Sequence, residues 1–163
     1  MQIELRHTFP VSPSRAFEVL FGEEYEVASA SQSRLERKVL EDRTEGGQRF
    51  RRVHVVPEQA FPAPVARVIG QDRFSYVLEE RHDLARHRMD WKVVPDAMAD
   101  KVKVQGSWQL DPAPGGCQRI VKIEINVQVP LVGGKIERQI GADLQASYEA
   151  AAQFAIRWLQ EHP

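Results

Sequence analysis

The chain has 163 residues, of which 42% are apolar and 28% charged, a composition typical of one folded globular domain and not of a disordered segment. Lysine and arginine number 22 against 23 aspartate and glutamate, so the net charge is −1. This balance argues against a nucleic-acid or anionic-membrane binder, which is usually basic. The single cysteine, Cys117, excludes an internal disulfide and any multi-cysteine zinc site. We expect a single domain over residues 1–163.

The sequence carries no targeting signal that we can identify. Residues 1–10 alternate polar and apolar side chains and lack the apolar core of a signal peptide. No run approaches the ~20 apolar residues that are needed to cross a bilayer. We therefore expect a cytoplasmic protein without a transmembrane segment.

The first thirty residues predict a strand followed by two short helices. Apolar or aromatic residues alternate with polar ones over 2–9, which indicates a half-buried strand. Ser12 is suited to the N-cap of a helix and Pro13 to its first position, and Gly22 is suited to ending it. A second short helix is expected over 23–30.

The middle of the chain predicts six strands in three hairpins. The paired segments are 34–41 with 48–56, 74–82 with 86–94, and 101–110 with 117–129, and their turns are expected at 42–47, 83–85 and 111–116. Three prolines over 57–64 interrupt the sheet, and one or two helical turns over 65–69 are closed by Gly70.

The last segment, 133–160, predicts one long amphipathic helix. Its apolar residues recur at spacings of three and four and so share one face. Strands 101–110 and 117–129 alternate apolar and polar side chains, as in an antiparallel sheet with one wet face. The expected fold is α+β, a curved seven-stranded antiparallel sheet wrapped around the C-terminal helix, with two short helices after the first strand.

This order of elements resembles the START-like superfamily, also called SRPBCC or the pollen-allergen helix-grip fold. Two runs, Pro130-Leu131-Val132-Gly133-Gly134-Lys135-Ile136-Glu137 and Pro62-Ala63-Pro64-Val65, are similar to a prokaryotic START-like family of uncharacterised function. The resemblance implies a hydrophobic pocket between the sheet and the C-terminal helix. The superfamily includes lipid carriers, plant-steroid and flavonoid binders, polyketide cyclases and chaperone-interacting domains.

On this fold the strand phases and the helical stripe select a set of residues that would line the pocket. The expected lining is Leu5, His7, Tyr76, Leu78, Glu80, Met89, Trp91, Val104, Trp108, Ile123, Ile125, Ile140, Leu144 and Tyr148. The stiff segment with Phe61, Pro62 and Pro64 is either a lid over the pocket or a connector whose Phe61 fills the core.

A second set of residues could carry acid–base or metal chemistry. If the 74–94 hairpin turns between Leu84 and Ala85, then His82 faces His87, Glu80 faces Met89, and Leu78 faces Trp91. Two histidines and a carboxylate at the open end of the pocket could bind a metal or transfer protons. The alternative is that the end of the hairpin is solvated.

His7 and a run of arginines have similar pairs of interpretations. His7 shares the phase of apolar residues, so it is either a polar anchor in the pocket or a core histidine hydrogen-bonded to a neighbour. Arg49, Arg51 and Arg52 are interpreted as a solvated strand face that Glu41, Asp42 and Glu45 offset, in preference to a nucleic-acid patch.

We therefore expect a non-enzymatic domain that binds a hydrophobic or lipid-like small molecule. It would have no cofactor, no metal and no assigned catalytic residue. Two alternatives stay open: a cyclase- or dehydratase-type enzyme that uses His7, Glu80, His82 and His87, and a protein-interaction module that modulates a chaperone or another partner. The oligomeric state and the ligand are not predicted.

Overall fold

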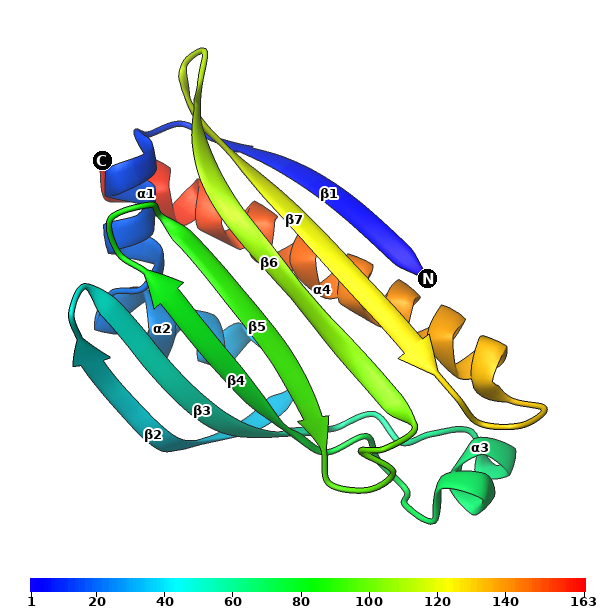
Figure 1. The fold of residues 1–163 in the computed structure, drawn as a ribbon. Coiled ribbons are helices and arrows are strands. Elements are labelled where there is room, and N and C mark those ends of the chain that lie inside the picture. Colours follow the sequence, from blue (N-terminus) through cyan, green and yellow to red (C-terminus); the bar gives the residue numbers. More distant parts are fainter.

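One antiparallel sheet of seven strands forms the body of the molecule in a computed structural model that describes residues 1–163 (Figure 1). In chain order the elements are β1 (Gln2–Phe9), α1 (Pro13–Leu20), α2 (Glu23–Gln32), β2 (Leu35–Glu45), β3 (Gln48–Pro57), α3 (Ala63–Ile69), β4 (Tyr76–Asp83), β5 (Arg88–Pro95), β6 (Val102–Ala113), β7 (Gly116–Val127) and α4 (Gly133–Glu161). The strand order is β1-β7-β6-β5-β4-β3-β2, so β1 and β2 form the two edges. The predicted α+β fold is confirmed.

Two of the three hairpin turns are shorter than the sequence predicts. The turns Gly46–Gly47 and Pro114–Gly115 contain two residues each, so the flanking strands continue through Glu45 and Ala113. Gly46 and Gly47 have φ values of 56° and 75°, a conformation that glycine adopts without a steric penalty. Most of the residues that the sequence assigns to these two turns therefore belong to the flanking strands.

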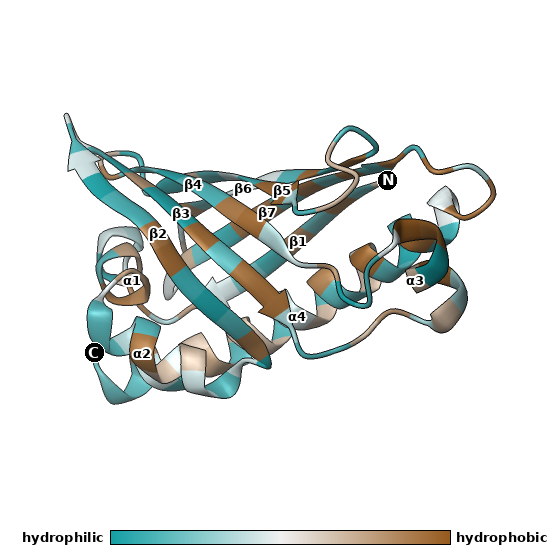
Figure 2. Ribbon diagram, turned by 90° about the horizontal axis from the view of Figure 1, so that it is seen from below, coloured by the Kyte–Doolittle hydropathy of each residue, from teal (hydrophilic) through white to brown (hydrophobic).

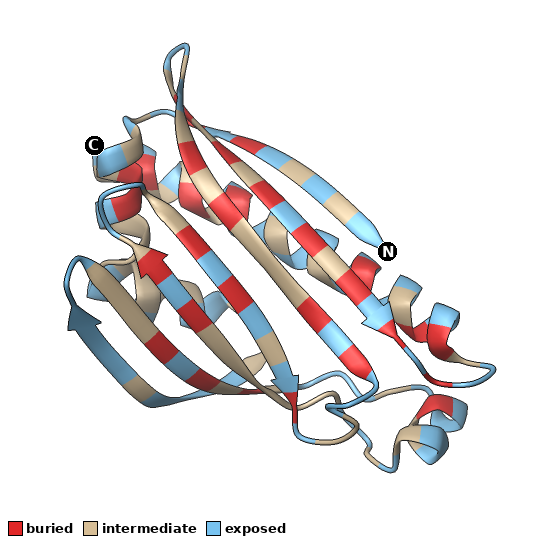
Figure 3. Ribbon diagram, viewed as in Figure 1, coloured by how far each residue is buried: buried red, intermediate tan, exposed pale blue.

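The core lies on one side of the sheet, which we call the inner face. Buried residues alternate with exposed ones along β5, β6 and β7, so alternate side chains point toward α4 (Figure 3). The helix α4 packs mainly against β7 and β1, and Ile136, Ile140, Ala155 and Leu159 are buried there. Gly141 of α4 lies close to the sheet, since a Cβ atom at this position would lie 2.7 Å from Met1 Sδ and 3.2 Å from Ile3 Cδ1.

The short helices close one end of the sheet. Ser12 caps α1 by accepting a hydrogen bond from the Arg15 amide at 3.3 Å, as predicted, and Ala16 and Phe17 of α1 are buried. No residue of α2 is buried, and its Tyr25 packs against rings of α4. No helix is long and apolar enough to span a membrane.

Candidate functional site

A band of apolar side chains on the inner face is only partly buried, and we call it the inner wall. Its members come from β4, β5 and α4: Tyr76, Leu78, Val93, Leu144 and Tyr148. Because α4 packs mainly against the β1–β7 side, the β4–β5 side of the inner face is less fully covered. Figure 2 shows the sheet above α2 and α4, with hydrophobic bands along its strands. Apolar surface that faces inward and keeps solvent access is suited to contact with another apolar molecule.

The other apolar residues of the predicted lining are more deeply placed. Leu5 is half-buried, like the inner wall, but the rest belong to the closely packed core: Met89, Trp91, Val104, Trp108, Ile123, Ile125 and Ile140. The strand residues among them lie on the inner face, as their strand phases predict, and Ile140 lies on α4. The solvent-accessible part of the predicted lining is therefore Leu5 on β1 together with the β4–β5 and mid-α4 portion.

A glycine on the neighbouring strand, Gly106, leaves room for the side chain of Trp91. Trp91 pairs with Gly106 in the β5–β6 register, and a Cβ atom on Gly106 would lie 2.6 Å from the indole ring. The indole can therefore lie across β6 next to the Tyr148 hydroxyl, whose pKa is raised because the group is buried. The indole nitrogen of Trp91 is buried, and the Tyr148 hydroxyl beside it is the group that can accept its proton.

A recess of about 960 Å³ lies on the opposite, outer face of the sheet. Its lining is mostly polar and charged, and several of these groups bind one another. Lys92 Nζ lies 2.9 Å from Glu79 Oε2, and Gln105 donates a hydrogen bond to Glu124 at 2.8 Å. This recess is not the predicted pocket between the sheet and the last helix. Its mutually paired groups are typical of a solvated sheet face.

The predicted register of the β4–β5 hairpin is wrong by two residues. His82 pairs with Met89, Glu80 with Trp91, and Leu78 with Val93, because the turn contains four residues, 84–87. His87 lies in that turn with φ 52° and packs against Phe17, so it does not face His82 across the strands. The side of the sheet predicted for these residues is still correct, since a shift of two residues keeps each side chain on the same face.

Glu80 and His82 also do not lie at an open, solvated end. His82 is 0% exposed, and its Nε2 atom lies 3.1 Å from Glu80 Oε2. The Phe21 ring covers the imidazole at a centroid distance of 4.3 Å and also stacks on Trp108. Nowhere in the chain do three or more histidine, cysteine or acidic side chains form a group suited to a metal ion.

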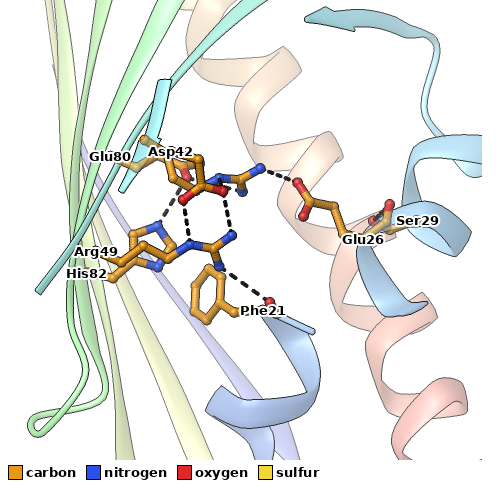
Figure 4. A network of polar contacts seen from close by, with 8 residues as sticks. Phe21, Glu26, Ser29, Asp42, Arg49, Glu80 and His82 are labelled. Atoms are coloured by element: carbon orange, nitrogen blue, oxygen red, sulfur yellow. Dashed lines mark hydrogen bonds and ion pairs between the residues drawn. The ribbon is translucent and has the colours of Figure 1, made fainter. Parts of the chain in front are cut away.

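Glu80 and His82 belong to a larger ionic cluster, which we call the paired network (Figure 4). Its members come from α2 and β2 to β4: Glu26, Asp42, Arg49, Arg51, Glu80 and His82. Arg51 is 6% exposed and lies among three carboxylates. Its guanidinium binds Glu26, and it lies 3.3 Å from Asp42 and 3.6 Å from Glu80. Each charge in this network has an opposite partner, which offsets the cost of burying it.

Two carboxyl groups of the paired network have a shifted pKa. Burial alone would raise the pKa of Glu80, but the hydrogen bond from His82 and the charges of His82 and Arg51 hold it below 4.5. For Asp42, the hydrogen bonds from Arg49 at 3.0 and 2.8 Å are the largest cause of a lowered pKa. Both carboxylates are therefore held in the charged form and bind the strands together.

A second polar cluster lies between β1, β7 and α4, and we call it the Arg119 cluster. It consists of Arg119, His7, Phe9, Tyr148 and Glu149. Arg119 Nη2 donates to His7 Nδ1 at 3.3 Å, and His7 Nε2 lies 3.4 Å from Glu149. His7 is therefore a buried histidine hydrogen-bonded to its neighbours, and burial lowers its pKa. This arrangement matches the structural interpretation of His7 and places it beside a buried cation.

Arg51 and Arg119 are the residues that sequence reasoning missed. Arg51 was interpreted as part of a solvated face, yet it is buried, and Arg119 was not singled out. A signal was present, because Arg51 shares the strand phase of Val53 and Val55, and Arg119 shares that of Val121 and Ile123. An arginine in phase with core residues indicates a buried charge that needs partners.

The predicted lid is a short connection that enters α3. Pro62 is the N-cap of α3, and Pro64 lies in its first turn, one residue before the predicted start of the helix. Phe61 packs against Phe74 at 6.1 Å, and Phe74 against Tyr76 of the inner wall at 5.6 Å. The segment therefore touches the inner wall through a row of three aromatic rings.

The fold defines the class of protein: it is a START-like, helix-grip fold. An aromatase/cyclase from Streptomyces sp. R1128 superposes with a TM-score of 0.68 at 14% identity, covering 98% of this chain and 93% of its own. Ara h 8.0201 superposes with 0.65 at 14% identity, covering 96% and 98%. A START superfamily protein from Mycobacterium smegmatis superposes with 0.62 at 12% identity, also covering 96% and 98%.

Within this class, residues 4–159 match the model of a family described as a protein of unknown function, DUF2505, and the chain belongs to that family. It is also 33% identical over 60 residues to the uncharacterized proteins Rv0481c of Mycobacterium tuberculosis and Mb0491c of Mycobacterium bovis. That match covers 36% of this chain and about a third, 34%, of the length of each relative. These likenesses fix the fold and the family.

Proposed function

We propose that this protein binds a hydrophobic or amphipathic small molecule against the inner wall. The observation that carries the proposal is the partial exposure of inward-facing apolar side chains on β4, β5 and α4. Contact with an apolar ligand would remove this surface from water, at about 25 cal/mol for each Å² that is buried. The aromatase/cyclase among the structural neighbours, whose name implies a small-molecule substrate, supports this proposal without indicating the ligand.

The acid–base alternative has less support from the geometry. Glu80 and His82 do meet at hydrogen-bond distance, but both are engaged in the paired network beneath Phe21. His7 is engaged with Arg119 and Glu149, and His87 lies in a turn. Binding without chemistry therefore remains the function that the geometry favours.

Two adjacent valines of β5 provide a matched test of the proposal. Val93 lies on the inner wall, whereas Val94 points to the outer face. A solvatochromic probe such as N-phenyl-1-naphthylamine should bind the wild type saturably. Val93→Asp should weaken that binding by about tenfold, because a carboxylate would be placed on the apolar contact surface.

The control variant, Val94→Asp, should bind the probe like the wild type. Circular dichroism and the melting temperature of both variants confirm that each is folded. The proposal is contradicted if the wild type shows no saturable binding, or if the two variants weaken it equally.

A further inference from the structure

Arg119 is a buried cation that lacks an anionic partner. It is 6% exposed, and no carboxylate lies within ion-pair distance of it: Glu149 pairs with His7 and acts on Arg119 only from farther away. A guanidinium cannot lose its proton inside a protein, so the charge itself persists. A buried charge without an opposite charge is costly, and it is usually paired. The cluster around Arg119 therefore has unused capacity for a negative group.

The hydrogen bonds of Arg119 leave donors unused. Nη2 donates to His7 Nδ1 at 3.3 Å and approaches the Tyr148 carbonyl oxygen at 3.5 Å, while Nε is buried with no acceptor. The guanidinium carbon also lies over the faces of Phe9 and Tyr148, at 5.2 and 5.4 Å from the ring centroids. Aromatic faces stabilise a cation but accept no conventional hydrogen bond.

The Arg119 cluster adjoins the inner wall through Tyr148. The guanidinium of Arg119 lies over the ring of this residue, and its hydroxyl lies beside the Trp91 indole nitrogen, from which it can accept a hydrogen bond. The unused groups of Arg119 are donors only, so a ligand that completes them must supply acceptors. The combination of an apolar wall and a buried cation calls for an amphipathic molecule.

We propose that Arg119 binds the carboxylate of an amphipathic monocarboxylic acid whose apolar part lies on the inner wall. This inference rests on the proposed function and deepens it by naming the ligand class. Charge-assisted hydrogen bonds from a guanidinium to a carboxylate are short, strong and frequently bidentate. A neutral ligand of the same length would make the apolar contacts without this ion pair.

The test compares dodecanoate with dodecan-1-ol, which have the same chain length and differ at the head group. Both displace a bound N-phenyl-1-naphthylamine probe at about pH 8, where the acid is ionised. The wild type should prefer dodecanoate by at least about tenfold. In Arg119→Met the two ligands should bind equally, while Arg119→Lys should keep part of the preference because it keeps the charge.

The matched control is Arg52→Met, since Arg52 lies exposed on the outer face and pairs with Glu79. This variant should keep the full preference for the acid. If Arg119→Met does not fold, the proposal is still tested by the preference for dodecanoate over dodecan-1-ol, measured in the wild type and in Arg119→Lys.

The outcomes separate the two proposals. Equal binding of acid and alcohol by the wild type overturns the role of Arg119 but leaves the inner wall as a binding surface. An acid preference that survives in Arg119→Met also overturns it. If neither ligand displaces the probe and the probe itself does not bind, the proposed function fails as a whole.

Discussion

The two polar clusters of the inner face each contain a buried arginine, and the two arginines differ in their carboxylate partners. In the paired network, Arg51 lies among three carboxylates from α2, β2 and β4. In the Arg119 cluster, a guanidinium of equal burial contacts a histidine, a carbonyl oxygen and two aromatic rings, and no carboxylate. The first arrangement pairs every charge with an opposite charge and serves stability, although Arg51 Nε and His82 Nδ1 are buried without a hydrogen-bond partner. The second differs in that no carboxylate lies within ion-pair distance of its guanidinium, which is the property that a binding site for an anion requires.

Trp91 separates the two clusters. Trp91 lies opposite Glu80 in the β4–β5 register, and its indole lies beside the Tyr148 hydroxyl of α4. The inner face thus runs from a closed ionic network beneath α1 and α2, past Trp91, to the unpaired cation beneath α4. The comparison predicts that equivalent substitutions in the two clusters have different consequences.

The largest effect is expected for Arg51→Met. Three carboxylates would lose their shared cation, and leaving buried charges unpaired typically costs about 3–5 kcal/mol in the free energy of unfolding. Urea denaturation measures this loss. Arg52→Met, on the adjacent exposed residue, should change the free energy of unfolding by about 1 kcal/mol or less. Similar losses in both variants would mean that the paired network does not stabilise the fold.

A smaller loss is expected for Gly106→Ala, between the two clusters. The added Cβ atom would lie 2.6 Å from the Trp91 ring and 2.5 Å from the Lys122 carbonyl oxygen, so the indole or the strand must move. We expect a loss of roughly 1–3 kcal/mol, together with weaker probe binding. An unchanged melting temperature with unchanged probe binding would show that the position of Trp91 is not constrained by β6.

The paired network also predicts a dependence of stability on pH. The pKa of Glu80 is lower in the folded state than its usual value of 4.5. Its stabilising effect is therefore fully present above that usual value and is lost as the pH falls through the folded-state pKa. In Glu80→Gln, the free energy of unfolding should fall less steeply between about pH 6 and pH 3 than in the wild type. Glu79→Gln, on the outer face of the same strand, is the control and should retain the wild-type slope.

The smallest effect on stability is expected for Arg119→Met. Replacing an unpaired buried cation by an apolar side chain of similar length should leave the free energy of unfolding within about 1 kcal/mol of the wild type, or raise it. Thermal and urea denaturation without ligand check this. A loss as large as that of Arg51→Met would mean that the contacts of Arg119 with His7, Phe9 and Tyr148 are structural.

The fold could be predicted because its signals are periodic and local. The alternation along β6 and β7 and the stripe along α4 set the inner face, and Ser12 and Pro13 set the start of α1. The register of the β4–β5 hairpin could not be predicted, because it depends on a four-residue turn in which His87 takes a left-handed conformation that is uncommon for residues other than glycine.

The candidate site was predicted less completely, for a different reason. Its polar contacts join residues that are distant in the sequence, such as Glu26 with Arg51 and His7 with Arg119. Strand phase could have shown that both arginines point inward. Which of them finds a carboxylate depends on where α2 and β2 come to lie, and no local pattern encodes that.

The most direct measurement of the central claim is the NMR signal of the Arg119 Nε–H group in ¹⁵N-labelled protein. Its resonance is assigned by its absence from the spectrum of Arg119→Met. Adding dodecanoate should shift this resonance and those of inner-wall methyl groups such as Leu78, whereas dodecan-1-ol should shift the methyl groups alone. If dodecanoate shifts the methyl resonances and leaves Arg119 Nε–H unmoved, the cation is not the partner of the ligand and the account is contradicted.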